Sequence, residues 1–67
     1  MKIILYTTEH CPVCKMIKDL LTTRNVEFET VGDLETMLGK GIKSAPMLEV
    51  NGEIMNAKNA MNWIKSL

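Results

Sequence analysis

Two cysteines that lie three positions apart, Cys11 and Cys14, separate a short apolar segment from a segment with helical periodicity. The apolar segment, residues 2–7, predicts a buried strand because it is a short run rich in isoleucine, leucine and tyrosine. Pro12 is typical of the first turn of a helix, where its missing N–H removes no hydrogen bond. This helix is expected to end at Arg24-Asn25, and its apolar residues are Val13, Met16, Ile17, Leu20 and Leu21.

A second strand and a short helix are expected next. Residues 26–30 alternate apolar and polar side chains, which predicts a half-buried strand. Asp33 is expected to cap a short helix that ends at Gly39, and residues 40–45 are expected to form a loop. The predicted apolar face of the short helix consists of Leu34, Met37 and Leu38.

The last third of the chain predicts a hairpin and a final helix. Asn51-Gly52 is a strong hairpin signal between strands 47–50 and 53–55, and Asn56 is expected to cap the helix. The inward residues of that helix are expected to be Ala60, Met61, Ile64 and Leu67. A helix between the first two strands is the crossover that a parallel pair requires. We therefore predict an α/β fold with a four-stranded mixed sheet, in the order β-α-β-α-β-β-α, with flanking helices.

The composition favours one globular domain over residues 1–67. Hydrophobic residues make up 46% of the chain, which is too high for a disordered protein. Eight Lys and Arg residues balance eight Asp and Glu residues, which argues against a nucleic-acid-binding protein. No apolar run approaches the roughly 18–20 residues of a membrane span, and the N-terminal run is too short for a signal peptide. We therefore expect a cytoplasmic protein without a membrane or nucleic-acid partner.

The position of the cysteine pair indicates redox chemistry. Disulfide exchange needs one thiolate that attacks and a second thiol that resolves the mixed disulfide. Cys11 is expected at the start of a helix, where free backbone N–H groups and the helix dipole stabilise an anion. Cys11 is therefore the predicted nucleophile, and Cys14, one turn later and more buried, is the predicted resolving thiol. Lys15 adds positive charge nearby, and His10 is a candidate for proton transfer.

Metal binding is the main alternative interpretation of the cysteines. A structural zinc site usually takes four protein ligands, and His10 is the only further soft ligand near Cys11, so we predict no metal site. His10 is also compatible with an ordinary surface position, and Trp63 is expected at the edge of the core. The methionines could indicate copper, but core packing is predicted for those on apolar helical faces, Met16, Met37 and Met61.

Three segments resemble a glutaredoxin: residues 6–14, Ser44-Ala45-Pro46 and the hairpin Val50-Asn51-Gly52. The similarity covers essentially the whole chain. Because the chain is somewhat shorter than typical members, it also resembles the small glutaredoxin-like redoxins that reduce ribonucleotide reductase. The resemblance implies a thioredoxin fold in which Cys11 and Cys14 are the active-site pair.

The resemblance also implies a set of substrate-binding residues. A cis peptide bond is expected between Ala45 and Pro46, with Pro46 facing the active-site cysteine. The Ala45 backbone is then expected to pair with an extended substrate or with glutathione, as in β-strand addition. Pro12 and Val13, between the cysteines, are expected to contact the substrate and to tune the reduction potential.

Two positions depart from the glutathione-using members of this family. Many of these members have a lysine three residues before the first cysteine, where this chain has Thr8. They also have a Gly-Gly-x-Asp-Asp run before the last helix, where this chain has residues 55–59 without glycines or acids. Asn56 and Asn59 are the remaining candidates for hydrogen bonds to glutathione there. The electron donor is thus either glutathione or a flavoprotein of the thioredoxin-reductase type.

The resulting hypothesis is a dithiol–disulfide oxidoreductase that acts as an electron carrier and reduces protein or glutathione-mixed disulfides. It needs no bound cofactor beyond the redox-active Cys11–Cys14 disulfide. A disulfide-containing protein, with ribonucleotide reductase as one candidate, is the expected partner. A glutathione-linked iron–sulfur cluster carrier is the alternative function, and a redox sensor without catalysis is a third. A monomer is expected because no long exposed apolar face is evident.

Overall fold

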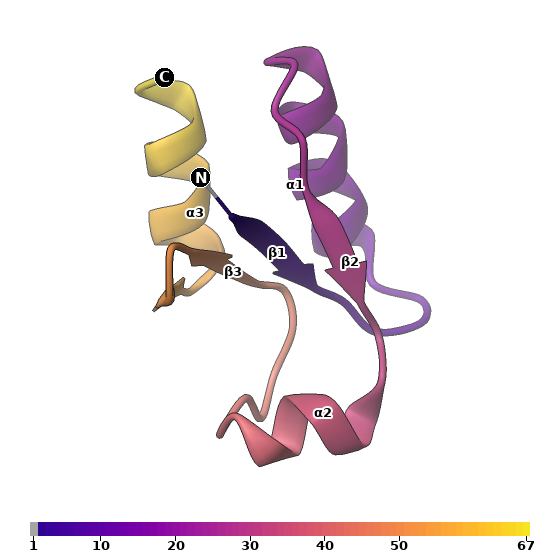
Figure 1. The fold of residues 1–67 in the computed structure, drawn as a ribbon. Coiled ribbons are helices and arrows are strands. Elements are labelled where there is room, and N and C mark those ends of the chain that lie inside the picture. The colour runs from indigo at the N-terminus through magenta and orange to yellow at the C-terminus, as the bar shows by residue number, and fades with distance from the viewer. Residues whose placement is uncertain (1) are drawn as a thin grey trace.

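The computed structural model describes residues 2–67, which form one mixed sheet and three helices (Figure 1). In chain order the elements are β1 (Ile3–Tyr6), α1 (Pro12–Thr23), β2 (Glu29–Val31), α2 (Leu34–Gly39), β3 (Met47–Val50), β4 (Glu53–Met55) and α3 (Ala57–Lys65). The strand order is β2-β1-β3-β4. β1 is parallel to β2 and antiparallel to β3, and β3 is antiparallel to β4. The predicted α/β fold with a four-stranded mixed sheet is confirmed.

Local sequence signals set several of the element boundaries. Asn51 and Gly52 both have positive φ angles, 50° and 90°, as a tight hairpin turn between twisted strands requires. The Asp33 carboxylate accepts a hydrogen bond from the Thr36 N–H at the start of α2, and Asn56 caps α3 in the same way. The predicted hairpin and both predicted helix caps are therefore confirmed. None of the helices within residues 2–67 is long and apolar enough to cross a membrane.

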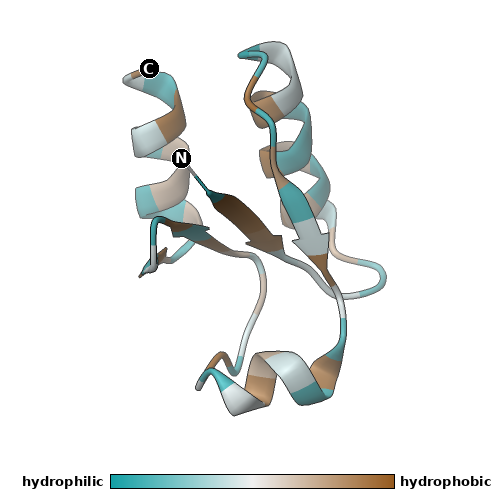
Figure 2. Ribbon diagram, viewed as in Figure 1, coloured by the Kyte–Doolittle hydropathy of each residue, from teal (hydrophilic) through white to brown (hydrophobic). Residues whose placement is uncertain are grey.

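One face of the sheet packs against α1 and α3 and forms the larger core. Leu5 and Leu48 pair across β1 and β3 and are fully buried, and their side chains share this face. Ile17 and Leu21 from α1 pack on the same cluster, which also contains the remaining buried residues Ile3, Ala60 and Ile64. Figure 2 shows β1, one of the two central strands, in apolar colouring along its length, and its residues contribute to both cores. This core holds α1, and therefore the cysteine pair, on the sheet.

The opposite face carries a smaller core beneath α2, which lies apart from α1 and α3 (Figure 1). Its buried members are Ile4, Tyr6, Met37 and Ile42. The Tyr6 hydroxyl donates a hydrogen bond of 2.7 Å to Glu49 Oε1, and Lys40 Nζ lies 3.2 Å from the same oxygen. This face therefore combines apolar packing with a polar network.

The second strand begins later than the alternating pattern predicts, at Glu29 rather than at residue 26. The Val26 N–H donates a hydrogen bond to the Leu21 carbonyl, which is one of the carbonyl groups at the end of α1. Val26 therefore pairs with the end of this helix and not with a neighbouring strand. Val26 and Phe28 still pack against the larger core from the loop. The prediction was wrong here because alternation reports which side chains are buried, and a loop that passes over a core has the same pattern.

Several apolar residues predicted on helical core faces are exposed instead. α1 buries only Cys14, Ile17 and Leu21, and α2 buries only Met37. The exposed residues are Val13, Met16, Leu34, Leu38 and Leu67. In α1 the buried stripe is narrow, and Met16 instead lines a surface groove between α1 and α3. α2 has only six residues, and Met37 is its one buried side chain. Leu67 lies beyond the end of α3, which is at Lys65.

Candidate active site

Cys11 is the N-cap residue of α1, with φ −108° and ψ 99°, and Pro12 occupies the first helical position. The first N–H groups of a helix have no partner within the helix, so they are free to donate to a group at the N-cap. The Cys14 N–H is one of these groups, and it donates a hydrogen bond of 3.1 Å to Cys11 Sγ. The local sequence thus places the Cys11 sulfur where helix dipole and hydrogen-bond donor both favour negative charge.

Cys11 and Cys14 are joined by a disulfide, with their Cα atoms 5.2 Å apart. The two residues differ in accessibility, because Cys11 is half-buried whereas Cys14 is only 4% exposed. Cys14 belongs to the buried stripe of α1 that continues through Ile17 and Leu21. Of the two sulfurs, the one on Cys11 is therefore the more open to a partner.

The cysteine pair opens into a cavity of about 340 Å³ between α1 and the loop that follows β1. Besides Cys11 and Cys14, its lining residues are Thr7, Thr8, His10, Lys15, Lys18 and Asp19. The sequence indicated His10 and Lys15, but it did not draw attention to Lys18 or Asp19. Helical spacing could have identified Lys18, because it lies four residues after Cys14 and therefore on the same side of α1.

The residues predicted to bind substrate lie outside this cavity, in three other places. Pro12 and Val13 are exposed on the first turn of α1, beside Cys11. The Ala45–Pro46 peptide bond is cis, as the resemblance implies. Ala45 is half-buried and packs against the smaller core, and Pro46 is buried. Substrate binding by these residues stays a prediction.

The third group of predicted residues is at the start of α3. Asn56 Oδ1 accepts a hydrogen bond of 2.9 Å from the Asn59 N–H, which is the N-cap interaction of this helix. This oxygen is therefore already engaged in holding the helix end. Asn59 and the neighbouring Lys58 are both exposed.

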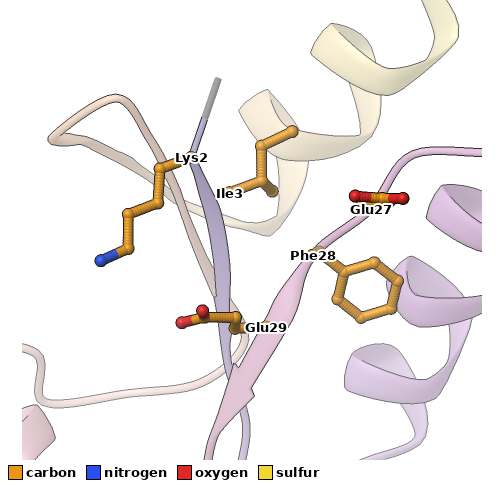
Figure 3. A pocket seen from close by; sticks show the side chains of 5 residues that line it. All are labelled: Lys2, Ile3, Glu27, Phe28 and Glu29. Carbon is orange, nitrogen blue, oxygen red and sulfur yellow. The ribbon is translucent and has the colours of Figure 1, made fainter.

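A second hollow lies beside β1 and β2 and contains neither cysteine. Figure 3 shows its lining side chains, Lys2, Ile3, Glu27, Phe28 and Glu29. In that view Lys2 and Glu29 point to one side of the strands, and Phe28 points to the other. Within residues 2–67 no three His, Cys, Asp or Glu side chains are grouped in a way that could hold a metal ion.

Comparison with known proteins agrees with this geometry. Residues 3–35, which include both cysteines, match the glutaredoxin family model. A comparison with curated proteins finds no significant match. Among solved structures, the thioredoxin-like protein BC3987 is similar with a TM-score of 0.78 and 24% sequence identity, covering 94% of this chain and 99% of that one. A point mutant of the same protein gives a TM-score of 0.77 and 22% identity, over 96% of this chain and 99% of that one.

These comparisons confirm the resemblance to the glutaredoxin family and the thioredoxin-like fold. The family match and the Cys11–Cys14 disulfide together fit a thiol–disulfide oxidoreductase.

Proposed function

We infer that this chain, glutaredoxin-like over residues 3–35 and thioredoxin-like in fold, is a dithiol–disulfide oxidoreductase with Cys11 as nucleophile and Cys14 as resolving thiol. One observation carries the assignment of roles: the Cys11 sulfur is accessible at the N-cap of α1, and Cys14 is buried one turn later within bonding distance. A helix N-terminus stabilises the thiolate that attacks, whereas a buried thiol is protected from outside partners.

The reaction proceeds by two exchanges. The Cys11 thiolate attacks one sulfur of the substrate disulfide, forms a mixed disulfide and releases the other substrate sulfur as a thiolate. Cys14 then loses its proton and attacks Cys11 Sγ, which releases the second substrate sulfur. Two electrons pass from the cysteine pair to the substrate, whose sulfurs leave as thiols once protonated. The chain is left with the Cys11–Cys14 disulfide, which an electron donor reduces again.

The Ala45–Pro46 segment is the proposed docking site for the polypeptide around the substrate disulfide. An extended backbone there would pair with Ala45, and the exposed Pro12 and Val13 would contact it from α1. Support comes from the burial of Pro46 and the packing of Ala45 on the smaller core, which keep this segment in one place. A disulfide-containing protein is therefore the proposed substrate, and ribonucleotide reductase is one candidate.

A flavoprotein of the thioredoxin-reductase type is the proposed electron donor, in preference to glutathione. Lys58 adds a positive charge near the start of α3, which would repel the glutathione ammonium group. Asn56 is the nearest polar substitute for the missing acids, but its side-chain oxygen already accepts the helix-capping hydrogen bond. Thr8 supplies no positive charge for a glutathione carboxylate.

Insulin reduction with dithiothreitol as the electron source tests the reaction and the roles of the cysteines. We expect turnover above the dithiothreitol background by the wild-type chain and none above that background by Cys11→Ser. When reduced Cys14→Ser is freed of dithiothreitol and mixed with insulin, we expect a trapped mixed disulfide, detected by mass spectrometry. Equal activity of the wild type and Cys11→Ser would overturn the assignment. Replacing dithiothreitol by glutathione with its reductase, or by thioredoxin reductase with NADPH, tests the donor, and robust turnover with glutathione would overturn that part. An iron–sulfur absorption band in the purified protein would instead favour the cluster carrier.

A further inference from the structure

His10, directly before Cys11, has an unusual backbone conformation. Its φ angle is 58°, in the left-handed region that only a few per cent of residues other than glycine adopt, histidine more often than most. Such conformations persist where the surrounding structure requires them, and they recur at functional sites. The His10 side chain lines the same cavity as both cysteines. A strained backbone and a titratable side chain thus coincide at the active site.

Cys14 has a chemical requirement that this cavity can meet. In the disulfide form Cys14 is 4% exposed. Burial at this position would disfavour the charged form of the reduced thiol, yet that thiol must lose its proton before it attacks Cys11. The cavity of about 340 Å³ is far larger than the about 30 Å³ of liquid volume that one water molecule occupies. Two threonine side chains, Thr7 and Thr8, supply polar lining for such water. A proton that leaves Cys14 can therefore pass through water in this pocket.

The titratable side chains around the cavity differ in their ability to accept that proton. α1 contributes Lys15, Lys18 and Asp19, and the loop after β1 contributes His10. An ammonium group has no lone pair with which to accept a proton, and a carboxylate is a weaker base than an imidazole. Imidazole is the side chain whose ordinary titration lies nearest neutral pH, so it both accepts and returns a proton readily.

We propose that the His10 imidazole accepts the Cys14 proton, through water in the cavity, during the resolving exchange. The proposal rests on the proposed function, since without disulfide exchange there is no resolving step. The Cys14 S–H bond breaks and its proton passes to the imidazole. The freed electron pair forms the bond to Cys11 Sγ, and the Cys11–substrate S–S bond breaks with its electron pair on the substrate sulfur. The imidazolium then gives up the proton to that sulfur or to solvent.

Ellman's reagent separates the two exchanges. Attack by Cys11 on this aromatic disulfide releases one coloured thiolate, and attack by Cys14 on the mixed disulfide releases a second. Because the aromatic thiolate leaves without needing a proton, the second phase reports the deprotonation of Cys14. Stopped-flow absorbance then gives both rates as a function of pH, and Cys14→Ser, which must release only one equivalent, identifies the second phase.

Two substitutions of His10 remove the imidazole while keeping the backbone. Asparagine and glycine both tolerate positive φ, so His10→Asn and His10→Gly avoid the strain that alanine would add. Glu9→Gln is the matched control, because Glu9 is the exposed neighbour that does not line the cavity. Far-ultraviolet circular dichroism and urea unfolding establish that the variants are folded.

In the wild type we expect the second phase to accelerate as the pH rises, because only the neutral imidazole can accept a proton. In His10→Asn this acceleration disappears, and the second phase at neutral pH slows by at least about tenfold, while the first phase is unchanged. Added imidazole restores the second phase of His10→Gly, which a structural role would not allow. Glu9→Gln behaves as the wild type.

Two results would overturn the inference. Equal second-phase rates and pH profiles in the wild type and His10→Asn would show that Cys14 loses its proton without His10. Slowing of the first phase by the same factor as the second would show that His10 acts on Cys11 instead. Release of only one thiolate by the wild type would contradict the proposed function itself, so the two failures are distinguishable.

Discussion

The two faces of the sheet are stabilised in different ways. The face covered by α1 and α3 has a core of apolar side chains, with Leu5, Ile17 and Leu48 fully buried. The face covered by α2 has fewer buried residues, and one of them, Tyr6, donates its hydroxyl to Glu49. α1, which carries the cysteines, is therefore held by extensive apolar packing. α2, which leads to the Ala45–Pro46 segment, is held by one buried side chain, Met37, beside a polar network.

This difference assigns separate structural roles to the two halves of the proposed site. The larger core holds α1 in its position and orientation on the sheet, so a substitution that disrupts this core should unfold the domain. The smaller core fixes the segment that is proposed to pair with substrate, so damage there should be milder and more local. Substitutions on the two faces test this separation.

Ile17→Ala should have the largest effect, a loss of about 4 kcal/mol in the free energy of unfolding. Ile17 is fully buried between the sheet and α3, so truncation leaves a cavity that surrounding side chains cannot fill. A chain of this size has a total stability of about 3–10 kcal/mol, at about 0.05–0.15 kcal/mol per residue, so the variant could be largely unfolded. Ile17→Val, expected to lose only about 1 kcal/mol, keeps the effect measurable by urea denaturation.

Met37→Ala is the matched truncation on the other face, with an expected loss of about 2 kcal/mol. Met37 is also buried, but α2 is short and its other apolar residues, Leu34 and Leu38, are exposed, so the helix can settle toward the sheet. Urea denaturation of the two alanine variants compares the faces directly. If Met37→Ala proves as damaging as Ile17→Ala, the two faces contribute equally and the proposed separation is wrong.

Tyr6→Phe should lose about 2 kcal/mol, because it removes a hydrogen bond to a charged carboxylate and changes the packing little. Tyr6 is 1% exposed, and its hydroxyl lies 2.7 Å from Glu49 Oε1. A double-mutant cycle with Glu49→Ala, which removes the accepting oxygen, isolates the interaction from the rest of each substitution. Additive losses in that cycle would mean that the polar network contributes nothing specific to this face.

The sequence predicted those parts of the fold that depend on local signals. Pro12 at the first turn of α1, the Asn51-Gly52 turn, and the caps Asp33 and Asn56 each act through hydrogen bonds or φ angles within a few residues. The placement of C-x-x-C between the first strand and a helix also depends on neighbouring residues only. For these features the pattern and the physical cause lie in the same short segment, so the sequence was sufficient.

Features that depend on distant residues were missed. The hydrogen bond between Tyr6 and Glu49 joins residues 43 positions apart, and no local pattern indicates it. Met16 and Leu38 satisfy helical periodicity, yet both are exposed, because burial depends on which other elements pack against each helix. The cavity beside the cysteines arises where α1 meets the loop after β1, so Asp19 gained significance only from the three-dimensional arrangement.

Asn56→Ala should lose about 1 kcal/mol, since it removes the N-cap hydrogen bond of α3, a helix that packs only on the larger core. Asn56→Asp keeps an accepting oxygen at the same position and should lose much less. Thermal unfolding monitored by circular dichroism measures both. A loss of the same size in Asn56→Asp would indicate that the amide nitrogen, and not the capping oxygen, matters here.

Acid should weaken the α2 face through Glu49, and we expect this to be the smallest of the effects. The hydrogen bond from Tyr6, together with that from Lys40, lowers the pKa of Glu49 below its ordinary value. A carboxyl whose pKa is lower in the folded state adds stability that is complete above its unfolded pKa, near 4.5, and is lost as pH falls through the folded value.

The expected signature is therefore a decline in the free energy of unfolding below about pH 4.5 that is shallower in Glu49→Gln, measured by urea denaturation at several pH values. Glu53→Gln on the neighbouring strand is the control, because Glu53 is exposed. If Glu49→Gln and Glu53→Gln change the decline at acid pH by the same amount, the decline reflects the overall charge of the protein. A decline that persists unchanged in Glu49→Gln would place the acid-sensitive group outside the α2 face.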